Sequence, residues 1–143
     1  YYYFSKYNFS LNIVYLYETY YEFDTRDKFF NIIKSKIINK KTINLTSKNL
    51  KLNFIHFKDL SDAICSLLKI DKKKRLSRFS IRGQEITLNN LIKLIVKHSS
   101  YHVSYNYDAN LKYNSKKRLF YFKRPPGWSP KIKLETFIKN FIS

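Results

Sequence analysis

Short apolar runs alternate along this chain with longer stretches that carry apolar residues at helical spacing. Runs rich in β-branched and aromatic residues predict strands at residues 11–17, 42–45, 52–57, 78–81 and 101–105. Apolar residues at i, i+3, i+4 and i+7 predict helices near residue 26, over 59–70, after 87 and at the C-terminus. Strands that alternate with helices indicate an α/β fold.

The helix at 59–70 follows directly on a strand. Asp59 is the expected N-cap, with Asp62 as its capping-box partner. We expect one apolar stripe, formed by Leu60, Ala63, Ile64, Leu67 and Leu68. Cys65 lies on the same side and is interpreted as a small buried apolar residue.

The other helices have similar signals. Asp24 or Thr25 can cap the helix near Arg26, whose stripe is Phe29, Ile32, Ile33 and Ile37. Thr87 caps a helix with the face Leu88, Leu91, Ile92 and Ile95. The last helix presents Leu134, Phe137, Ile138, Phe141 and Ile142, and Trp128 is expected to anchor it by packing.

Composition narrows the class of protein. The 143 residues suffice for one domain, and 44% of them are hydrophobic, which supports a packed core. No apolar run approaches the ~18 residues that a membrane span needs, and no signal-peptide pattern is recognisable in the first residues given. A single cysteine allows no internal disulfide, so we expect a reducing, cytoplasmic setting and no membrane partner.

The charge is strongly positive, with 28 Lys and Arg against 10 Asp and Glu, a net +18. Such a balance can indicate nucleic-acid binding through phosphate neutralisation. The basic residues are dispersed, however, and are mostly Lys amid Asn, Ile, Tyr and Phe, a composition that A/T-rich codons also produce. A basic, non-catalytic nucleic-acid-binding module is therefore the alternative function, and not the expected one.

Four segments, in order along the chain, resemble one enzyme family. They are YETYYEFDTRDK at 17–28, NFIHFKDLSDAI at 53–64, RFSIRGQEITLNNLI at 78–92 and PGWSPKIKLETFI at 126–138. They are similar to "L-x-N-T-Y-G-P-x-D-x-R-x-K", "D-F-I-H-V-D-D-V-A-D-A-I", "Y-N-I-G-x-G-x-x-x-S-L-x-E-L-I" and "L-G-W-x-P-K-x-S-L-E-E-G-I". These are segments of the extended short-chain dehydrogenases/reductases, the NAD(P)-dependent epimerases and dehydratases of nucleotide-activated sugars.

The resemblance implies a fold and a domain organisation. The chain 1–143 would be the C-terminal part of a Rossmann-type doubly wound sheet interleaved with a small α/β substrate-binding lobe. Segments 11–17 and 52–70 would belong to the nucleotide-binding sheet, and 26–45 and 78–142 mainly to the lobe. The missing N-terminal half of the same enzyme is then an expected partner, as is a second copy in a homodimer.

The family's reactive groups are not recognisable in this chain. Its dinucleotide motif is a glycine-rich turn, whereas this chain has only Gly83 and Gly127. Tyr2 and Lys6 fit the spacing of the catalytic Tyr and Lys by chance, because too few residues follow for the helix, loop and strand required. We therefore expect no catalytic residue here, and NAD or NADP bound mainly by the missing part. The intact parent would be an epimerase, dehydratase or reductase, and the isolated chain would be inactive.

The resemblance also implies where a nucleotide-activated sugar would bind. Leu16 and Tyr17 would lie against the nicotinamide, and Tyr21 replaces a usual glycine. The substrate-binding residues would be Glu18, Thr19 and Tyr20, with Arg26, Lys28 and Arg118 for the diphosphate. The alternatives are a solvated Glu18 and local ion pairs of Arg26 and Lys28 with Asp24 and Asp27.

The spacing of the three histidines does not indicate a metal site. His56 lies within a strand and is interpreted as a hydrogen-bonded core residue. His98 and His102 have no Cys or acidic neighbour at ligand spacing, so no zinc site is expected.

Overall fold

A computed structural model describes residues 6, 10–70, 76–108 and 121–142. In this part of the chain the strands are β1 (Leu11–Leu16), β2 (Glu18–Tyr20), β3 (Ile43–Leu45), β4 (Lys51–His56), β5 (Leu76–Ile81), β6 (Gln84–Thr87) and β7 (Tyr105–Tyr107). The helices are α2 (Phe29–Ile38), α3 (Phe57–Leu68), α4 (Leu88–His98) and α5 (Leu134–Ile142). The α/β class predicted from the pattern is confirmed.

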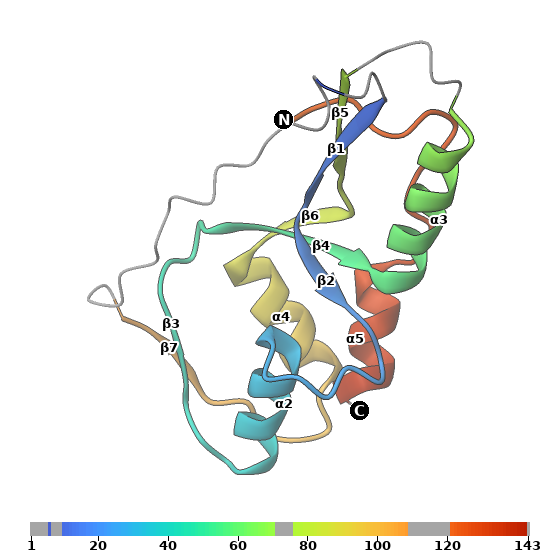
Figure 1. Cartoon of the computed structure of the whole chain (residues 1–143). Coiled ribbons are helices and arrows are strands. Elements are labelled where there is room, and N and C mark those ends of the chain that lie inside the picture. Colours follow the sequence, from blue (N-terminus) through green and yellow to red (C-terminus); the bar gives the residue numbers. More distant parts are fainter. Residues whose placement is uncertain (1–5, 7–9, 71–75, 109–120, 143) are drawn as a thin grey trace.

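The strands form three small sheets. β1 pairs with β5 and β3 pairs with β7, both in parallel. β4 is the centre of the third sheet, parallel to β2 on one side and antiparallel to β6 on the other. In Figure 1, β2 continues the path of β1 and crosses beside β4, so the chain passes from one sheet to the next at Tyr17.

Two hydrophobic clusters lie on opposite sides of β4. Leu52 and Phe54 belong to the larger cluster and Ile55 to the smaller one, because successive side chains of a strand point to opposite faces. The larger cluster joins helices α2, α4 and α5, which stand together in Figure 1. The smaller cluster packs α3 against β5 and contains Trp128.

The predicted faces of α4 and α5 are confirmed. Thr87 Oγ1 accepts a hydrogen bond from the Asn90 backbone N–H and so caps α4. Every apolar residue assigned to these two faces is buried: Leu88, Leu91, Ile92, Ile95, Leu134, Phe137, Ile138, Phe141 and Ile142.

The expected start of α3 is wrong. The helix begins two residues earlier, and His56 is its N-cap, because His56 Nδ1 accepts the Lys58 backbone N–H at 3.1 Å. Asp59 lies in the first turn and accepts the backbone N–H groups of Lys131 and Ile132 instead, each at 3.0 Å. Asp59 therefore accepts hydrogen bonds from residues far along the chain instead of capping its own helix.

The expected stripe of α3 is only half buried. Leu60, Ala63 and Leu67 are buried, whereas Ile64 and Leu68 are 44% and 78% exposed. Cys65 is exposed as well, which corrects its interpretation as a buried residue. The side chains of residues 60, 63 and 67 face β5. The residue after each of them is rotated by about 100° around the helix axis, so its side chain points away from this packed face.

Four further expectations need correction. Neither Asp24 nor Thr25 caps α2. This helix starts at Phe29, and its N-cap residue Lys28 makes no side-chain hydrogen bond to the helix. The expected apolar stripe of α2 included Ile32, but Ile32 is 43% exposed, and Phe30 is buried in its place. Trp128 packs with α3 and β5, and α5 belongs to the other cluster. The strand expected at 101–105 lies at Tyr105–Tyr107.

Candidate functional site

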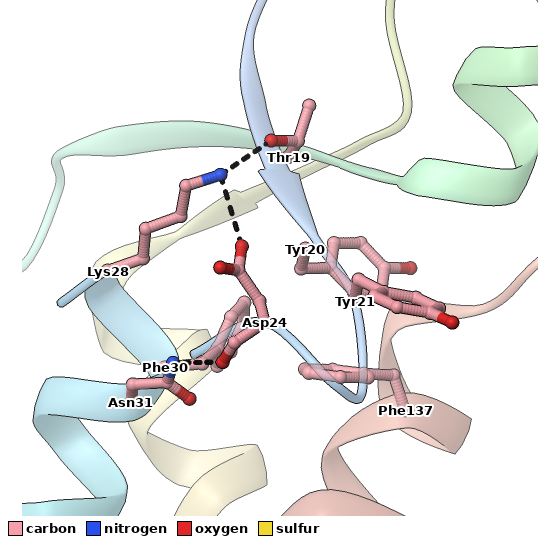
Figure 2. A pocket seen from close by; sticks show the side chains of 8 residues that line it. All are labelled: Thr19, Tyr20, Tyr21, Asp24, Lys28, Phe30, Asn31 and Phe137. Atoms are coloured by element: carbon pink, nitrogen blue, oxygen red, sulfur yellow. Dashed lines mark hydrogen bonds and ion pairs between the residues drawn. The ribbon is translucent and has the colours of Figure 1, made fainter. Parts of the chain in front are cut away.

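The loop between β2 and α2 brings half of the predicted site residues together, namely Thr19, Tyr20, Arg26 and Lys28. Thr19 and Tyr20 end β2, and Lys28 precedes α2. A small, open pocket with room for about one water molecule lies between them (Figure 2). Its lining consists of Thr19, Tyr20, Tyr21, Asp24, Lys28, Phe30, Asn31 and Phe137.

Polar contacts fix one wall of this pocket. Lys28 Nζ donates to Thr19 Oγ1 at 2.9 Å and lies 3.3 Å from Asp24 Oδ2 (Figure 2). Asn31 Nδ2 donates to the carbonyl oxygens of Asp24 and Arg26. The loop is thereby tied to the first turn of α2, and the ammonium group of Lys28 is held at the pocket by two oxygen partners.

Asp24 is the centre of a local ion-pair group. Arg26 donates to both of its carboxylate oxygens, from Nε at 2.7 Å and from Nη2 at 2.8 Å. These bonds, with Lys28 nearby, hold the pKa of Asp24 well below its usual range. Of the ion pairs that the sequence left open as an alternative for Arg26 and Lys28, those with Asp24 are thus present.

Tyr20 forms the apolar wall. Its side chain is buried, its ring centroid lies 4.5 Å from that of Phe137 and 5.2 Å from that of His56, and its hydroxyl donates to the Ile132 carbonyl at 3.4 Å. Burial, with the nearby carboxylates of Asp59 and Glu22, raises the pKa of this hydroxyl above its usual value. Tyr20 therefore stays neutral and shapes the pocket.

His56 and Glu22 form a polar pair next to Tyr20. His56 is buried, as expected, and its Nε2 lies 3.0 Å and 3.2 Å from the two carboxylate oxygens of Glu22. Because Nδ1 accepts the Lys58 N–H, Nε2 carries the proton and donates to Glu22. Burial is the largest single influence and would raise the pKa of Glu22, but the His56 hydrogen bond, a backbone hydrogen bond and the nearby charges of His56 and Lys58 together lower it. Sequence reasoning assigned no role to Glu22, since its partner lies 34 residues away.

The remaining predicted residues lie elsewhere. Leu16 ends β1 and is half exposed, and Tyr17 and Glu18 are partly buried at the passage into β2. Arg118 and Tyr2 lie outside the described residues, and Lys6 is exposed. No group of three His, Cys, Asp or Glu side chains suited to a metal ion occurs in the ranges given above. Within those ranges no helix combines the length and apolarity that a bilayer crossing requires.

The two glycines serve packing and a turn. A Cβ atom on Gly83 would lie 1.9 Å from the Phe54 carbonyl oxygen, so β4 needs the absence of a side chain there. Gly127 has φ +65°, in the region that favours glycine. Neither lies in a glycine-rich turn that could receive a pyrophosphate.

No protein-family model and no curated protein sequence matches this chain. Solved structures match it by fold. UDP-glucose 4-epimerase from Thermotoga maritima with UDP-glucose has a TM-score of 0.71 at 14% identity, over 99% of this chain and 47% of that one. UDP-glucuronic acid 4-epimerase from Bacillus cereus, in complex with UDP-glucuronic acid and NAD, gives 0.71 at 14%, over 98% and 46%.

A third structure, RMD from Pseudomonas aeruginosa complexed with NADPH, has a TM-score of 0.70 at 13% identity, over 98% of this chain and 49% of that one. The chain thus spans about half the length of the structures that it matches. At such low identity the match concerns the backbone. This chain therefore has the mixed α/β, Rossmann-type fold of the matching part of these proteins.

Proposed function

We propose that this chain is the sugar-nucleotide-binding part of an NAD(P)-dependent nucleotide-sugar epimerase, dehydratase or reductase. The observation that carries the proposal is the backbone match over almost the whole chain to structures solved with UDP-sugars and with NAD or NADPH. The four sequence segments described above support it independently. In this proposal the chain is a C-terminal portion, and its N-terminal counterpart, possessing the dinucleotide turn and the catalytic Tyr and Lys, is the partner.

The site would work by binding and orientation. Glu18 and Thr19 come just after the carboxyl end of β1, a strand of a parallel pair, and this is where α/β proteins bind ligands. They would contact the sugar, with Tyr20 as the wall behind it. Leu16 and Tyr17 would contact the nicotinamide ring, and the dinucleotide when bound would supply hydride transfer. Segments 11–17 and 52–70 would belong to the sheet that binds the dinucleotide.

The diphosphate would bind near Lys28 and Arg26. Both cations are already oriented by Asp24, so less side-chain entropy is lost when an anion arrives. Arg118 would add a third cation. A homodimer of the complete enzyme is part of the same proposal.

Calorimetric titration of the chain with UDP-glucose and with UDP tests the binding role. We expect both to bind, and Lys28→Ala to weaken each about tenfold or more, since a hydrogen bond to a charged group is lost. Lys41→Ala, which removes an exposed Lys beyond α2, is the matched control. The chain alone should not turn over UDP-glucose with NAD. Turnover, or an absence of UDP binding, would contradict the proposal.

The net charge of +18 favours one second candidate, a nucleic-acid-binding module. It would bind DNA or RNA with an affinity that falls steeply with added salt, and would not respond to UDP-glucose. A fluorescence-anisotropy titration with a labelled oligonucleotide at two salt concentrations separates the two functions.

A further inference from the structure

Three large aromatic side chains stand exposed beside the pocket. Tyr21, Phe23 and Phe57 are 40%, 77% and 53% exposed. The ring centroid of Tyr21 lies 5.4 Å from that of Phe23 and 5.9 Å from that of Phe57. Leaving three neighbouring rings in water forgoes the free energy that their burial would provide, so such a group indicates a binding surface.

The position of the group is that of a ligand site. Tyr21 follows β2, and Phe57 follows β4, so both lie at the carboxyl ends of two parallel paired strands. Tyr21 also lines the pocket that contains Thr19 and Lys28 (Figure 2). One aromatic residue therefore belongs both to the pocket and to the exposed group.

An anchored carboxylate accompanies the rings. Glu22 lies between Tyr21 and Phe23 in the chain, and its side chain is 40% exposed. His56 holds it from the core side through Nε2. A carboxylate has about four acceptor positions, so lone pairs remain for further donors.

The chemistry of this combination suits a sugar ring. The face of an aromatic ring is electron-rich and attracts the polarised C–H groups of a pyranose, and a carboxylate accepts its hydroxyl groups. The Tyr21 ring is inclined by 67° to Phe23 and by 49° to Phe57, so the group offers no single flat platform. A puckered pyranose fits such a surface better than a planar base does.

We infer that Tyr21, Phe23, Phe57 and Glu22 form a subsite for the sugar ring of a nucleotide-activated sugar. This inference rests on the proposed function and deepens it, because it adds the rings to the sugar contacts of Glu18 and Thr19 and leaves the diphosphate to the cations of the pocket. Tyr21, where the resembling family has glycine, becomes a residue that determines which sugar is bound.

Calorimetry with two ligands tests the subsite. Phe23→Ala and Tyr21→Ala should each weaken UDP-glucose binding about two- to tenfold, the loss expected for one aromatic contact. Binding of UDP, which has no hexose, should not change for Phe23→Ala, because Phe23 does not line the pocket. Tyr21→Phe should restore most of the affinity for UDP-glucose, since it keeps the ring.

Tyr101→Ala is the matched control, because Tyr101 is 56% exposed and lies outside the group. Circular dichroism of each variant establishes that it folds. Equal losses for UDP and UDP-glucose, or no loss for either, would overturn the subsite while leaving the proposed function intact. If the unaltered chain binds neither ligand, the proposed function itself fails.

Discussion

His56 Nε2 donates to the Glu22 carboxylate at 3.0 Å while the Nδ1 atom of the same ring accepts the backbone N–H of Lys58. One buried imidazole thus caps α3 and fastens the loop that follows β2. The hydrogen bonds of this single side chain therefore connect the loop of the candidate site to the first turn of α3.

Replacing His56 should destabilise the fold. His56→Ala removes the cap, leaves the Glu22 carboxylate without this partner and opens a cavity, so we expect unfolding to require about 2–4 kcal/mol less free energy. Urea denaturation measures this value. His102→Ala, at an exposed position, should change it by less than about 0.5 kcal/mol. Equal effects of the two variants would contradict the role of His56.

Asp59 should matter far more than its neighbour Asp62. Asp59→Ala removes the acceptor of two backbone N–H groups, at Lys131 and Ile132, and should cost about 2–4 kcal/mol. Asp62 is exposed, and Asp62→Ala is expected to cost less than about 0.5 kcal/mol. The comparison of urea midpoints distinguishes the observed start of α3 from the start predicted by the capping-box pattern, which would make both aspartates matter.

Leu67 and Leu68 test the orientation of α3. Leu67 is 6% exposed, and Leu67→Ala should cost about 2–5 kcal/mol through lost burial and a cavity. Leu68 is 78% exposed, so Leu68→Ala should cost less than about 0.5 kcal/mol. Thermal melting of both variants is the measurement, and a reversed order would mean that the helix is rotated.

Gly83 and Gly127 should respond differently to alanine. At Gly83 the new Cβ would overlap the Phe54 carbonyl, a backbone group that cannot turn aside, so Gly83→Ala should prevent stable folding or lower the melting temperature sharply. At Gly127 nothing lies within 4 Å of the added atom, and only the positive φ is strained. Gly127→Ala should therefore cost about 1–2 kcal/mol. A milder effect at Gly83 than at Gly127 would refute this packing argument.

Glu135 should contribute a pH-dependent part of the stability. Lys97 and His98 hydrogen-bond its carboxylate and lower its pKa from 4.5 to about 2. A depressed folded-state pKa stabilises the fold above the unfolded value and loses this effect as the pH falls toward the folded value. The contribution should thus be complete above about pH 5 and disappear between pH 4.5 and 2.

NMR titration of the Glu135 side chain measures this pKa directly. The urea midpoint of Glu135→Gln should depend less on pH than that of the unaltered chain, whereas Asp27→Asn, at an exposed position, serves as the control. A normal pKa for Glu135 would show that the α4–α5 ion pairs do not persist in solution.

Helices α4 and α5 show what the sequence can determine. Their stripes and the Thr87 cap depend on residues within one or two helical turns, and the structure has them as expected. The larger cluster buries the whole apolar face of each helix. Where a face is fully enclosed, periodicity alone identifies the buried residues.

Helix α3 shows what only tertiary packing decides. Its apolar arc is wider than the face that the sheet can cover, so periodicity could not tell that Leu67 is buried and Leu68 is exposed. Asp59 meets the local requirements of an N-cap, but its partners lie 72 and 73 residues away. A pattern within one helical turn carries no information on such a distant donor.

The candidate site, too, could be predicted from the sequence only in part. The family resemblance implied that Thr19, Tyr20 and Lys28 bind substrate, and the fold brings these three residues around one pocket. The sequence could not indicate the bond from Lys28 to Thr19, the pairing of Glu22 with His56, or the grouping of Phe57 with Tyr21. Local patterns determined the elements, because hydrogen bonding and burial within an element repeat with its period. The contacts between elements depended on how β2, β4 and α3 pack together, and only the tertiary structure decided that.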